Sequence, residues 1–422
     1  MAQLAVHQEF PRHTVLPAAP PRSWTVSGRI RSPLAQAVRR ASVRQGPTAL
    51  AVVLGAEYRP ADDAALLGAV ARARAEGLPL ALLHEGAGGL SLLRAAGLED
   101  RALRFASVQV DGRTPAALAA APAAAAAALE SDRLGSPGQR REVLVEEQGR
   151  TLTWHWRRVE LPPAAAPLTG ADPSGPVLVT GGLGGLGLRA AAVIGAATGA
   201  RVLLLDARDP GELTARERRV LERVRSGAGG AEVLTADVTD RAAVAEVLAK
   251  AGGGPPATLV HCAGLVEGGR LDGLRPDDLA RLRAVKTDGL RNVLHATDRG
   301  ALRRIVGFGS VISRRAHSGM GAYALANEVL RREALRAAVR LPGCAVVVAE
   351  WSLWSGAGEA HRMGVVKDAA LMGMPPVPLR PGMSALLAML GRPAGADRCA
   401  ALVVTASGDR GFPEPAPAGD VS

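Results

Sequence analysis

The segment 307–330, GFGSVISRRAHSGMGAYALANEVL, holds a serine and a tyrosine whose types and spacing suit one reaction. The chain has only two tyrosines, and Tyr323 stands thirteen residues after Ser310 and four residues before Asn327. The segment is typical of a strand end, a glycine-containing loop and a helix. The tyrosine then either packs against its neighbours or meets the serine over a substrate carbonyl. The second arrangement is the one that reduction of a ketone requires.

Ketone reduction needs a proton donor and hydrogen-bond donors around one oxygen. Hydride transfer leaves negative charge on the carbonyl oxygen, so both kinds of donor must converge there. A free tyrosine has a pKa of about 10 and is a poor proton source at neutral pH. A nearby ammonium group favours the phenolate and lowers the pKa of the phenol. The chain has only three lysines, Lys250, Lys286 and Lys367, so few side chains could supply this ammonium group.

A glycine-rich segment indicates where a dinucleotide would bind. PVLVTGGLGGLG predicts an apolar strand and a tight turn, and an alanine-rich helix follows. Glycines let the backbone turn sharply and let a pyrophosphate approach the helix N-terminus, where amide dipoles favour anions. The flanking strand and helix make the motif more specific than its glycines alone. The predicted cofactor contacts in this segment are Thr180, Gly181, Gly182, Leu183, Gly185, Leu186 and Gly187.

Two further strand ends extend the predicted cofactor site. The segment VLTADVTD places Asp237 and Val238 at a strand end, which suits the edge of an adenine ring. The buried-strand pattern TLVHCAGL ends in Ala263 and Gly264, whose small size leaves room for a flat ligand.

Two residues could recognise the cofactor's 2′ position, and they favour different cofactors. Asp206 ends the strand in GARVLLLDARD, nineteen residues after Gly187, and suits a free ribose hydroxyl and hence NAD. Arg208 suits the 2′-phosphate of NADP instead. At ~4 Å and an effective dielectric constant of about 20, either charge changes phosphate binding by roughly 4 kcal/mol. The sequence leaves open which of the two charges lies nearer.

Alternating strand and helix patterns predict an α/β fold with two Rossmann-like subdomains. From residue 175 to 407 the pattern predicts a doubly wound parallel sheet, with ligands at the carboxyl ends of its strands. From about 49 to 111 a βαβαβ-like rhythm predicts a second, smaller Rossmann-like unit. The glycines of HEGAGGLSLL there are interpreted as a plain turn rather than a phosphate loop, because no matching charged partner follows the next strand.

The segments between these two patterns set the predicted domain boundary. The alanine-rich segment 114–130 predicts two short helices or a kink at Pro122. The segments 141–147 and 151–161 predict a hairpin that turns around Gly149. A proline-rich stretch follows, so we expect a structural subdomain at 1–170 and a catalytic, NAD(P)-binding subdomain at 171–422.

Composition narrows the class of protein. The 422 residues, 48% of them hydrophobic, suffice for two cores, and no apolar run predicts a membrane span or a secretory signal. Three widely spaced cysteines favour free thiols in a reducing cytoplasm and no zinc site. The net charge of +11 comes from arginines scattered among acids, and aromatic residues make up 3%, which disfavours nucleic-acid binding. Attraction to an anionic cofactor or an acidic carrier protein explains the charge as well.

These motifs resemble the short-chain dehydrogenase/reductase superfamily, and more closely the ketoreductase domains of polyketide and fatty-acid synthases. Most short-chain dehydrogenases carry a lysine four residues after the tyrosine and an asparagine on the preceding helix, whereas synthase ketoreductases exchange the two. This chain has Lys286 on the earlier helix and Asn327 after Tyr323. The resemblance covers residues 175–407. It implies that Ser310 bonds the substrate carbonyl, that Tyr323 donates the proton, that Lys286 lowers the pKa of the phenol and that Asn327 holds a proton-relay water.

The resemblance also implies a function and partners. It implies a β-ketoacyl reductase that transfers hydride from NADPH to the 3-keto group of a thioester on the phosphopantetheine arm of an acyl carrier protein. NADH stays open because of Asp206. The first half resembles a truncated, cofactor-free structural subdomain, which implies a monomer or weak dimer. Two alternatives remain: a reductase of a free small ketone in a tailoring step, and a catalytically silent cofactor-binding scaffold. Silent domains usually lack the serine, tyrosine or lysine, and all three are present here.

Some segments depart from the family pattern. One class of product configuration goes with an LDD triplet where this chain reads LVEG (265–268), and the other with a tryptophan where this chain has Arg315. Arg315 is either a phosphate contact for the pantetheine arm or an exposed loop residue. The segment 350–365 is expected to be a mobile lid. The segment 372–390 resembles the C-terminal part of ketoreductases from polyunsaturated-fatty-acid and enediyne-type synthases. With no carrier or condensing segment in view, the chain is expected to be a free-standing enzyme or an isolated domain.

Overall fold

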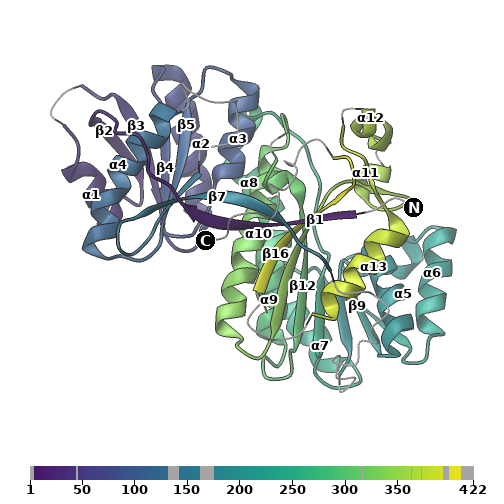
Figure 1. The fold of residues 1–422 in the computed structure, drawn as a ribbon. Coiled ribbons are helices and arrows are strands. Elements are labelled where there is room, and N and C mark those ends of the chain that lie inside the picture. Colours follow the sequence, from purple (N-terminus) through teal and green to yellow (C-terminus); the bar gives the residue numbers. More distant parts are fainter. Residues whose placement is uncertain are drawn as a thin grey trace.

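The computed structural model describes residues 4–43, 46–131, 142–161, 175–315, 317–362, 364–371, 373–392 and 399–409. A sheet of fourteen strands runs through these residues, in the order β10-β9-β8-β11-β12-β13-β16-β1-β7-β6-β5-β4-β3-β2. Helices pack against this sheet in both halves of the chain (Figure 1). The predicted α/β class is confirmed.

The N-terminal half contributes seven of the described strands. They are β1 (Leu4–His13), β2 (Trp24–Gly28), β3 (Ala49–Leu54), β4 (Leu80–His84), β5 (Phe105–Val110), β6 (Glu142–Val145) and β7 (Thr151–Arg158). The helices are α1 (Pro33–Arg40), α2 (Pro60–Glu76), α3 (Leu90–Glu99) and α4 (Pro115–Ser131). Strands β2 to β6 pair in parallel. Every residue of β3 and β4 is buried, as the continuous apolar runs ALAVVL and LALLH require for strands covered on both faces.

The C-terminal half forms the predicted doubly wound sheet. Its strands are β8 (Val177–Thr180), β9 (Val202–Asp206), β10 (Ala231–Thr235), β11 (Thr258–His261), β12 (Arg304–Ser310), β13 (Ala345–Trp351) and β16 (Cys399–Ala406). These strands pair in parallel, and β14 (Trp354–Ser355) and β15 (Val377–Pro378) form a separate small sheet. The α-helices are α5 (Gly187–Thr198), α6 (Ala215–Arg225), α7 (Arg241–Lys250), α8 (Pro276–Arg283), α9 (Gly289–Ala296), α10 (Gly321–Arg340), α11 (Glu359–Arg362), α12 (Val366–Leu371) and α13 (Leu379–Leu390). Short turns are η1 (Pro210–Glu212), η2 (Leu271–Gly273) and η4 (Val311–Ser313), with a π-helical turn at η3 (Ala284–Asp288).

Strand β1 joins the two halves into one sheet. It pairs antiparallel with β16 on one side, where Leu4 lies opposite Ala406, and with β7 on the other, where His7 lies opposite Arg158. Figure 1 shows β1 crossing the middle of the molecule between the two halves. The sequence analysis did not predict this strand.

Helix α10 lies at the contact between the halves and belongs to both cores. Its residues Leu325 and Val329 pack in one buried apolar cluster with Leu92 of α3 and Phe105 of β5. The long helix of the C-terminal half is therefore held by apolar residues of the N-terminal half.

Several local predictions can be compared with the structure. The hairpin is confirmed, since β6 and β7 are antiparallel and Gly149 turns with a φ of 80°. The alanine-rich segment forms one helix, α4, that includes Pro122, so of the two predicted alternatives the one with two short helices is wrong. Alanine has the highest helix propensity, and the helix is stabilised by burial against the sheet. The predicted boundary at residue 170 lies outside the described residues.

None of the described helices is long and apolar enough to cross a membrane.

Candidate active site

Ser310 and Tyr323 lie at the ends of two elements that contact each other. Strand β12 ends at Ser310, whose hydroxyl accepts a hydrogen bond from the Ile312 amide at 3.4 Å. Helix α10 begins at Gly321, so Tyr323 stands in its first turn. Helix α10 packs against both β12 and the η4 turn that follows Ser310. This packing brings the two segments together at the carboxyl end of the parallel strands, where such folds bind ligands.

Lys286 is a buried cation at the same end of the sheet. Its Nζ donates a hydrogen bond to the carbonyl oxygen of Phe308 at 3.0 Å, two residues before Ser310. Burial lowers the pKa of Lys286 from 10.5 to about 8. A Cβ added to Gly264 would lie 2.8 Å from this Nζ, so Gly264 and the ammonium are in contact. The structure thus places Lys286 between the end of β11 and the end of β12.

His261 fixes the backbone that carries Lys286. Its ring is buried, with Nε2 2.8 Å from the Lys286 carbonyl oxygen and Nδ1 2.8 Å from the Thr180 hydroxyl. A carbonyl accepts only, so Nε2 donates to it and Nδ1 accepts from Thr180. Burial, with the nearby Lys286 ammonium, lowers the pKa of His261 to about 3 and keeps the ring neutral. The sequence analysis gave this histidine no role, although it stands at a predicted strand end.

Asn327 lies one helical turn after Tyr323. Its side-chain nitrogen donates to the Tyr323 carbonyl oxygen at 2.8 Å. The side chain is fully buried, and its Oδ1 has no hydrogen-bond partner among the described residues. A buried acceptor without a partner is a place for an ordered water. The expectation that Asn327 holds a water remains a prediction that this orphaned oxygen supports.

The glycine segment forms a cradle that side chains would fill. Gly181 has a φ of 61°, and a Cβ there would lie 2.9 Å from the Ala263 backbone. A Cβ on Gly187, the first residue of α5, would lie 2.1 Å from the Gly181 oxygen. The loop therefore requires glycine at both positions, and it precedes a helix N-terminus as pyrophosphate binding needs. The cradle and the helix N-terminus fit a dinucleotide.

Asp206 and Arg208 lie beside that cradle and are bonded to it. The Asp206 carboxylate accepts hydrogen bonds from the Leu183 amide at 2.9 Å and from the Arg208 amide at 3.0 Å. The Arg208 guanidinium donates to the Leu183 carbonyl oxygen, and its Nε lies 3.7 Å from the Asp206 carboxylate. The two charges that the sequence analysis weighed against each other are therefore an adjacent pair.

The other predicted cofactor residues lie just after the ends of β10 and β11. Asp237 is exposed and accepts hydrogen bonds from the Thr239 amide and hydroxyl at 2.8 Å. Val238 is buried against α9, where a Cβ added to Gly289 would lie 2.8 Å from its side chain. Ala263, also buried, contacts Gly181. Their proposed contacts with adenine and nicotinamide stay predictions.

Three other predicted features can be located. Arg315 is partly buried and forms an ion pair with Asp409 at 3.0 Å, so the interpretation as an exposed loop residue is wrong. In the LVEG segment, Glu267 pairs with Arg281. A Cβ added to Gly185 would lie 3.0 Å from the Gly358 amide nitrogen, so the expected lid segment lies against the glycine cradle.

A buried carboxylate holds the segment between Ser310 and Tyr323. Glu350 of β13 is fully buried and accepts from the Ser313 hydroxyl and from Arg314 Nε at 2.8 Å. Arg314 also pairs with Glu9 of β1. Among the residues that the structure describes, no group of three or more His, Cys, Asp or Glu side chains could hold a metal ion.

The comparisons with known proteins agree with this arrangement. Residues 175–356 match the sequence model of the KR domain family. The pikromycin polyketide synthase component PikAIII of Streptomyces venezuelae is 36% identical over 217 residues, which are 50% of this chain and 13% of that protein. The spectinabilin polyketide synthase system protein NorB of Streptomyces orinoci is 35% identical over 188 residues, 44% of this chain and 9% of that protein.

Two solved structures share the fold over nearly the whole chain. The ketoreductase PlmKR1, from the first module of phoslactomycin biosynthesis in Streptomyces sp. HK803, superposes with a TM-score of 0.73 at 23% identity, over 96% of this chain and 93% of that chain. The structure of an A1-type ketoreductase gives a TM-score of 0.75 at 21% identity, over 95% and 92%.

The parallel sheet, the glycine cradle and the residues at the ends of β11 and β12 form an α/β fold that the two solved ketoreductase structures share. Within that fold, residues 175–356 are similar to the KR domain family.

Proposed function

We propose that this protein reduces the 3-keto group of an acyl thioester carried by an acyl carrier protein, with NADPH as hydride donor. The observation that carries the proposal is the buried Lys286 ammonium, bonded 3.0 Å from the Phe308 carbonyl oxygen beside Ser310. A buried cation at a strand end is costly unless it serves a negative charge. The alkoxide that ketone reduction generates is such a charge.

The chain's own residues would share the work at the carbonyl oxygen. Ser310 would donate a hydrogen bond to that oxygen, and Tyr323 would donate its phenolic proton to it. Lys286 would stabilise the phenolate that remains, because an ammonium nearby favours the charged form of the phenol. Asn327 Oδ1 would orient a water that returns a proton to the site. The nicotinamide cofactor, when bound, supplies the hydride.

The geometry around Asp206 supports NADPH over NADH. Each carboxylate oxygen of Asp206 already accepts a backbone amide, and the Arg208 guanidinium lies beside it. The negative charge that would repel a 2′-phosphate is therefore offset by a cation on the same short segment. Side-by-side reduction assays with NADPH and NADH test this choice, and a lower KM for NADH would contradict it.

We further propose that the substrate arrives on a carrier protein and that the chain works as a monomer or weak dimer. Relatives named as polyketide synthase components support the carrier-bound substrate. The continuous sheet through β1, which lets each half cover the other within one chain, supports the monomer. Light scattering that shows an obligate oligomer would contradict the second proposal.

The decisive experiment is the Tyr323→Phe variant. This change removes the proposed proton donor and keeps the ring, so turnover of a 3-ketoacyl pantetheine thioester should be lost while the Kd for NADPH stays nearly unchanged. Wild-type activity in the variant would rule out the mechanism. Comparison with untethered small ketones separates a carrier-dependent reductase from a tailoring enzyme, and absence of turnover with every ketone would indicate a silent cofactor-binding protein.

A further inference from the structure

One carboxylate of the N-terminal half binds two loops that border the proposed catalytic site. Glu99 is the last residue of α3. Its Oε1 accepts a hydrogen bond from the Gly319 amide at 2.9 Å, and its Oε2 accepts one from the Leu271 amide at 2.9 Å. A single side chain from the N-terminal half thus connects two separate segments of the C-terminal half.

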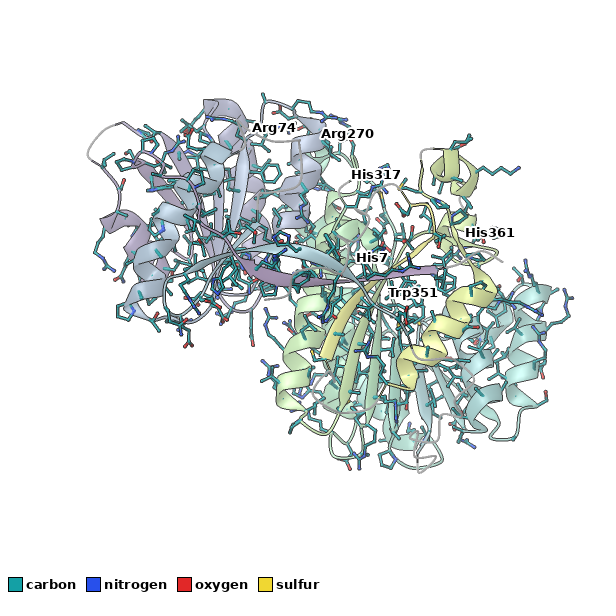
Figure 2. The ribbon with its side chains drawn as sticks, viewed as in Figure 1. His7, Arg74, Arg270, His317, Trp351 and His361 are labelled. Carbon is teal, nitrogen blue, oxygen red and sulfur yellow. The ribbon has the colours of Figure 1, made fainter. Side chains whose placement is uncertain are left out.

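Both segments lead directly to predicted catalytic residues. The 264–271 loop begins at Gly264, which contacts the Lys286 ammonium. The 317–320 loop ends where α10 begins, at Gly321, which is two residues before Tyr323. The two loops also touch each other, since the Gly269 amide donates to the Gly319 carbonyl oxygen at 2.7 Å. Figure 2 labels one residue of each loop, Arg270 and His317, on the side of the catalytic half that faces the N-terminal half.

The position of Glu99 is unfavourable for its own helix. A carboxylate in the last turn of a helix faces the negative end of the helix dipole, which costs about 0.3–1 kcal/mol. The two amides that it accepts from are both more than 170 residues away in sequence. The stabilisation of Glu99 therefore comes from the loops it binds and not from α3.

The rest of α3 holds the same region. Ser91, in the first turn of α3, donates from its amide and its hydroxyl to the Glu328 carboxylate of α10, at 2.9 and 2.7 Å. A Cβ added to Gly321 would lie 3.1 Å from Leu92 of α3. Helix α10 is thus fixed against α3 along its first turns, which gives Glu99 a rigid base from which to hold the loops.

We propose that Glu99 is a positioning residue that sets how the substrate ketone lies between the two loops, and through this the configuration of the alcohol product. The inference rests on the proposed ketoreductase function. A prochiral ketone yields one alcohol or its mirror image according to which of its faces meets the hydride donor. On this proposal the two substituents of the carbonyl would lie between the segments that Glu99 connects, so loosening these segments would admit the reversed orientation.

The test uses the full chain and four proteins: wild type, Glu99→Ala, Glu99→Gln and the control Glu85→Gln. Glu85 also accepts two hydrogen bonds, at 3.1 and 2.6 Å, but both come from Arg113 within the N-terminal half. Hydrogen–deuterium exchange is followed in peptides that cover 264–271 and 317–323. The same proteins reduce a 3-ketoacyl pantetheine thioester, and the alcohol enantiomers are separated by chiral chromatography. NADPH affinity is measured by fluorescence titration.

Loss of two charge-assisted hydrogen bonds in Glu99→Ala should accelerate exchange in both loops by about tenfold. The enantiomer ratio should fall by about fivefold and KM should rise, while the Kd for NADPH changes by less than about twofold. Glu99→Gln should lie between, because its amide offers a single acceptor oxygen and its NH₂ group opposes the second amide. Glu85→Gln should match the wild type.

Two results would overturn the proposal: unchanged exchange in both loops of Glu99→Ala, or faster exchange with an unchanged enantiomer ratio. If the wild type reduces no ketone, the proposed function fails, and the product-configuration role fails with it. Exchange in Glu99→Ala would still decide whether the carboxylate connects the two loops.

Discussion

The Lys286 ammonium should titrate far below an ordinary lysine. Burial lowers the pKa of this group from 10.5 to about 8, because the apolar surroundings disfavour the charged form. At about 1.36 kcal/mol per pH unit, this difference corresponds to about 3 kcal/mol that disfavours the ammonium in the folded protein. The hydrogen bond to the Phe308 carbonyl oxygen recovers only part of the lost hydration.

The small number of lysines makes the pKa of Lys286 accessible to NMR. The chain contains three lysines, so ¹³C-labelled lysine gives only three side-chain signals, and Lys286→Met identifies the one of interest. We expect its signal in the cofactor-free protein to shift with a midpoint at about pH 8. The same signal in the urea-unfolded chain should titrate near the ordinary value of about 10.4.

The same pKa predicts a sign for stability. The folded pKa is below the unfolded pKa, so between about pH 8 and pH 10.5 the unfolded chain binds the proton and the folded chain does not. The contribution of Lys286 to the free energy of unfolding therefore rises through this range. Below about pH 8 the buried ammonium is charged and destabilises the folded protein by the full amount. Lys286→Met lacks this dependence. The difference in stability between the variant and the wild type should shrink by about 2–3 kcal/mol from about pH 7 to about pH 10, measured by urea unfolding.

Two results would refute this reasoning. A folded-state midpoint equal to that of the unfolded chain would mean that the ammonium is hydrated and not buried. A constant stability difference across this range would mean that burial does not disfavour the charged form of Lys286.

Two further variants test the cradle and the contact between the halves. Gly187→Ala places a Cβ 2.1 Å from the Gly181 oxygen, so the Kd for NADPH in a fluorescence titration should rise by about tenfold or more, whereas Gly195→Ala in the same helix should bind normally. Normal binding by the first variant would contradict the cradle. The Arg283 guanidinium lies 3.0 Å from the buried Asp63 carboxylate. Arg283→Met leaves this carboxylate without its cation, so the free energy of unfolding in urea should fall by about 3 kcal/mol. A loss below about 1 kcal/mol would show that the pair does not stabilise the contact.

The fold of the C-terminal half could be predicted because its signals are local. Apolar runs such as VLVT and VLLLD are fully buried strands, and each leads into a turn whose residues suit a ligand. The segments at Ser310 and Tyr323 fell where predicted for the same reason: a strand end and a helix start are visible in the sequence itself.

The rest depends on contacts between distant residues. Strand β1 has an irregular burial pattern and includes Pro11, and its partners lie about 150 and 400 residues away, so no local period indicated it. His261 and Glu99 act through backbone groups of other segments, which have no sequence signature. Arg315 could be interpreted only once Asp409 was found beside it.

The central place of β1 has a consequence for biosynthesis. Because its first residues pair with β16, whose last residue is Ala406, the ribosome must release the residues up to about Ala406 before the sheet closes. Until then the edge of β1 that pairs with β16 stays unpaired, and a fragment that begins after the proline-rich stretch would keep the matching edge of β16 exposed for good. When expressed alone, the C-terminal half should therefore self-associate through this edge, even though every residue of its glycine cradle is present.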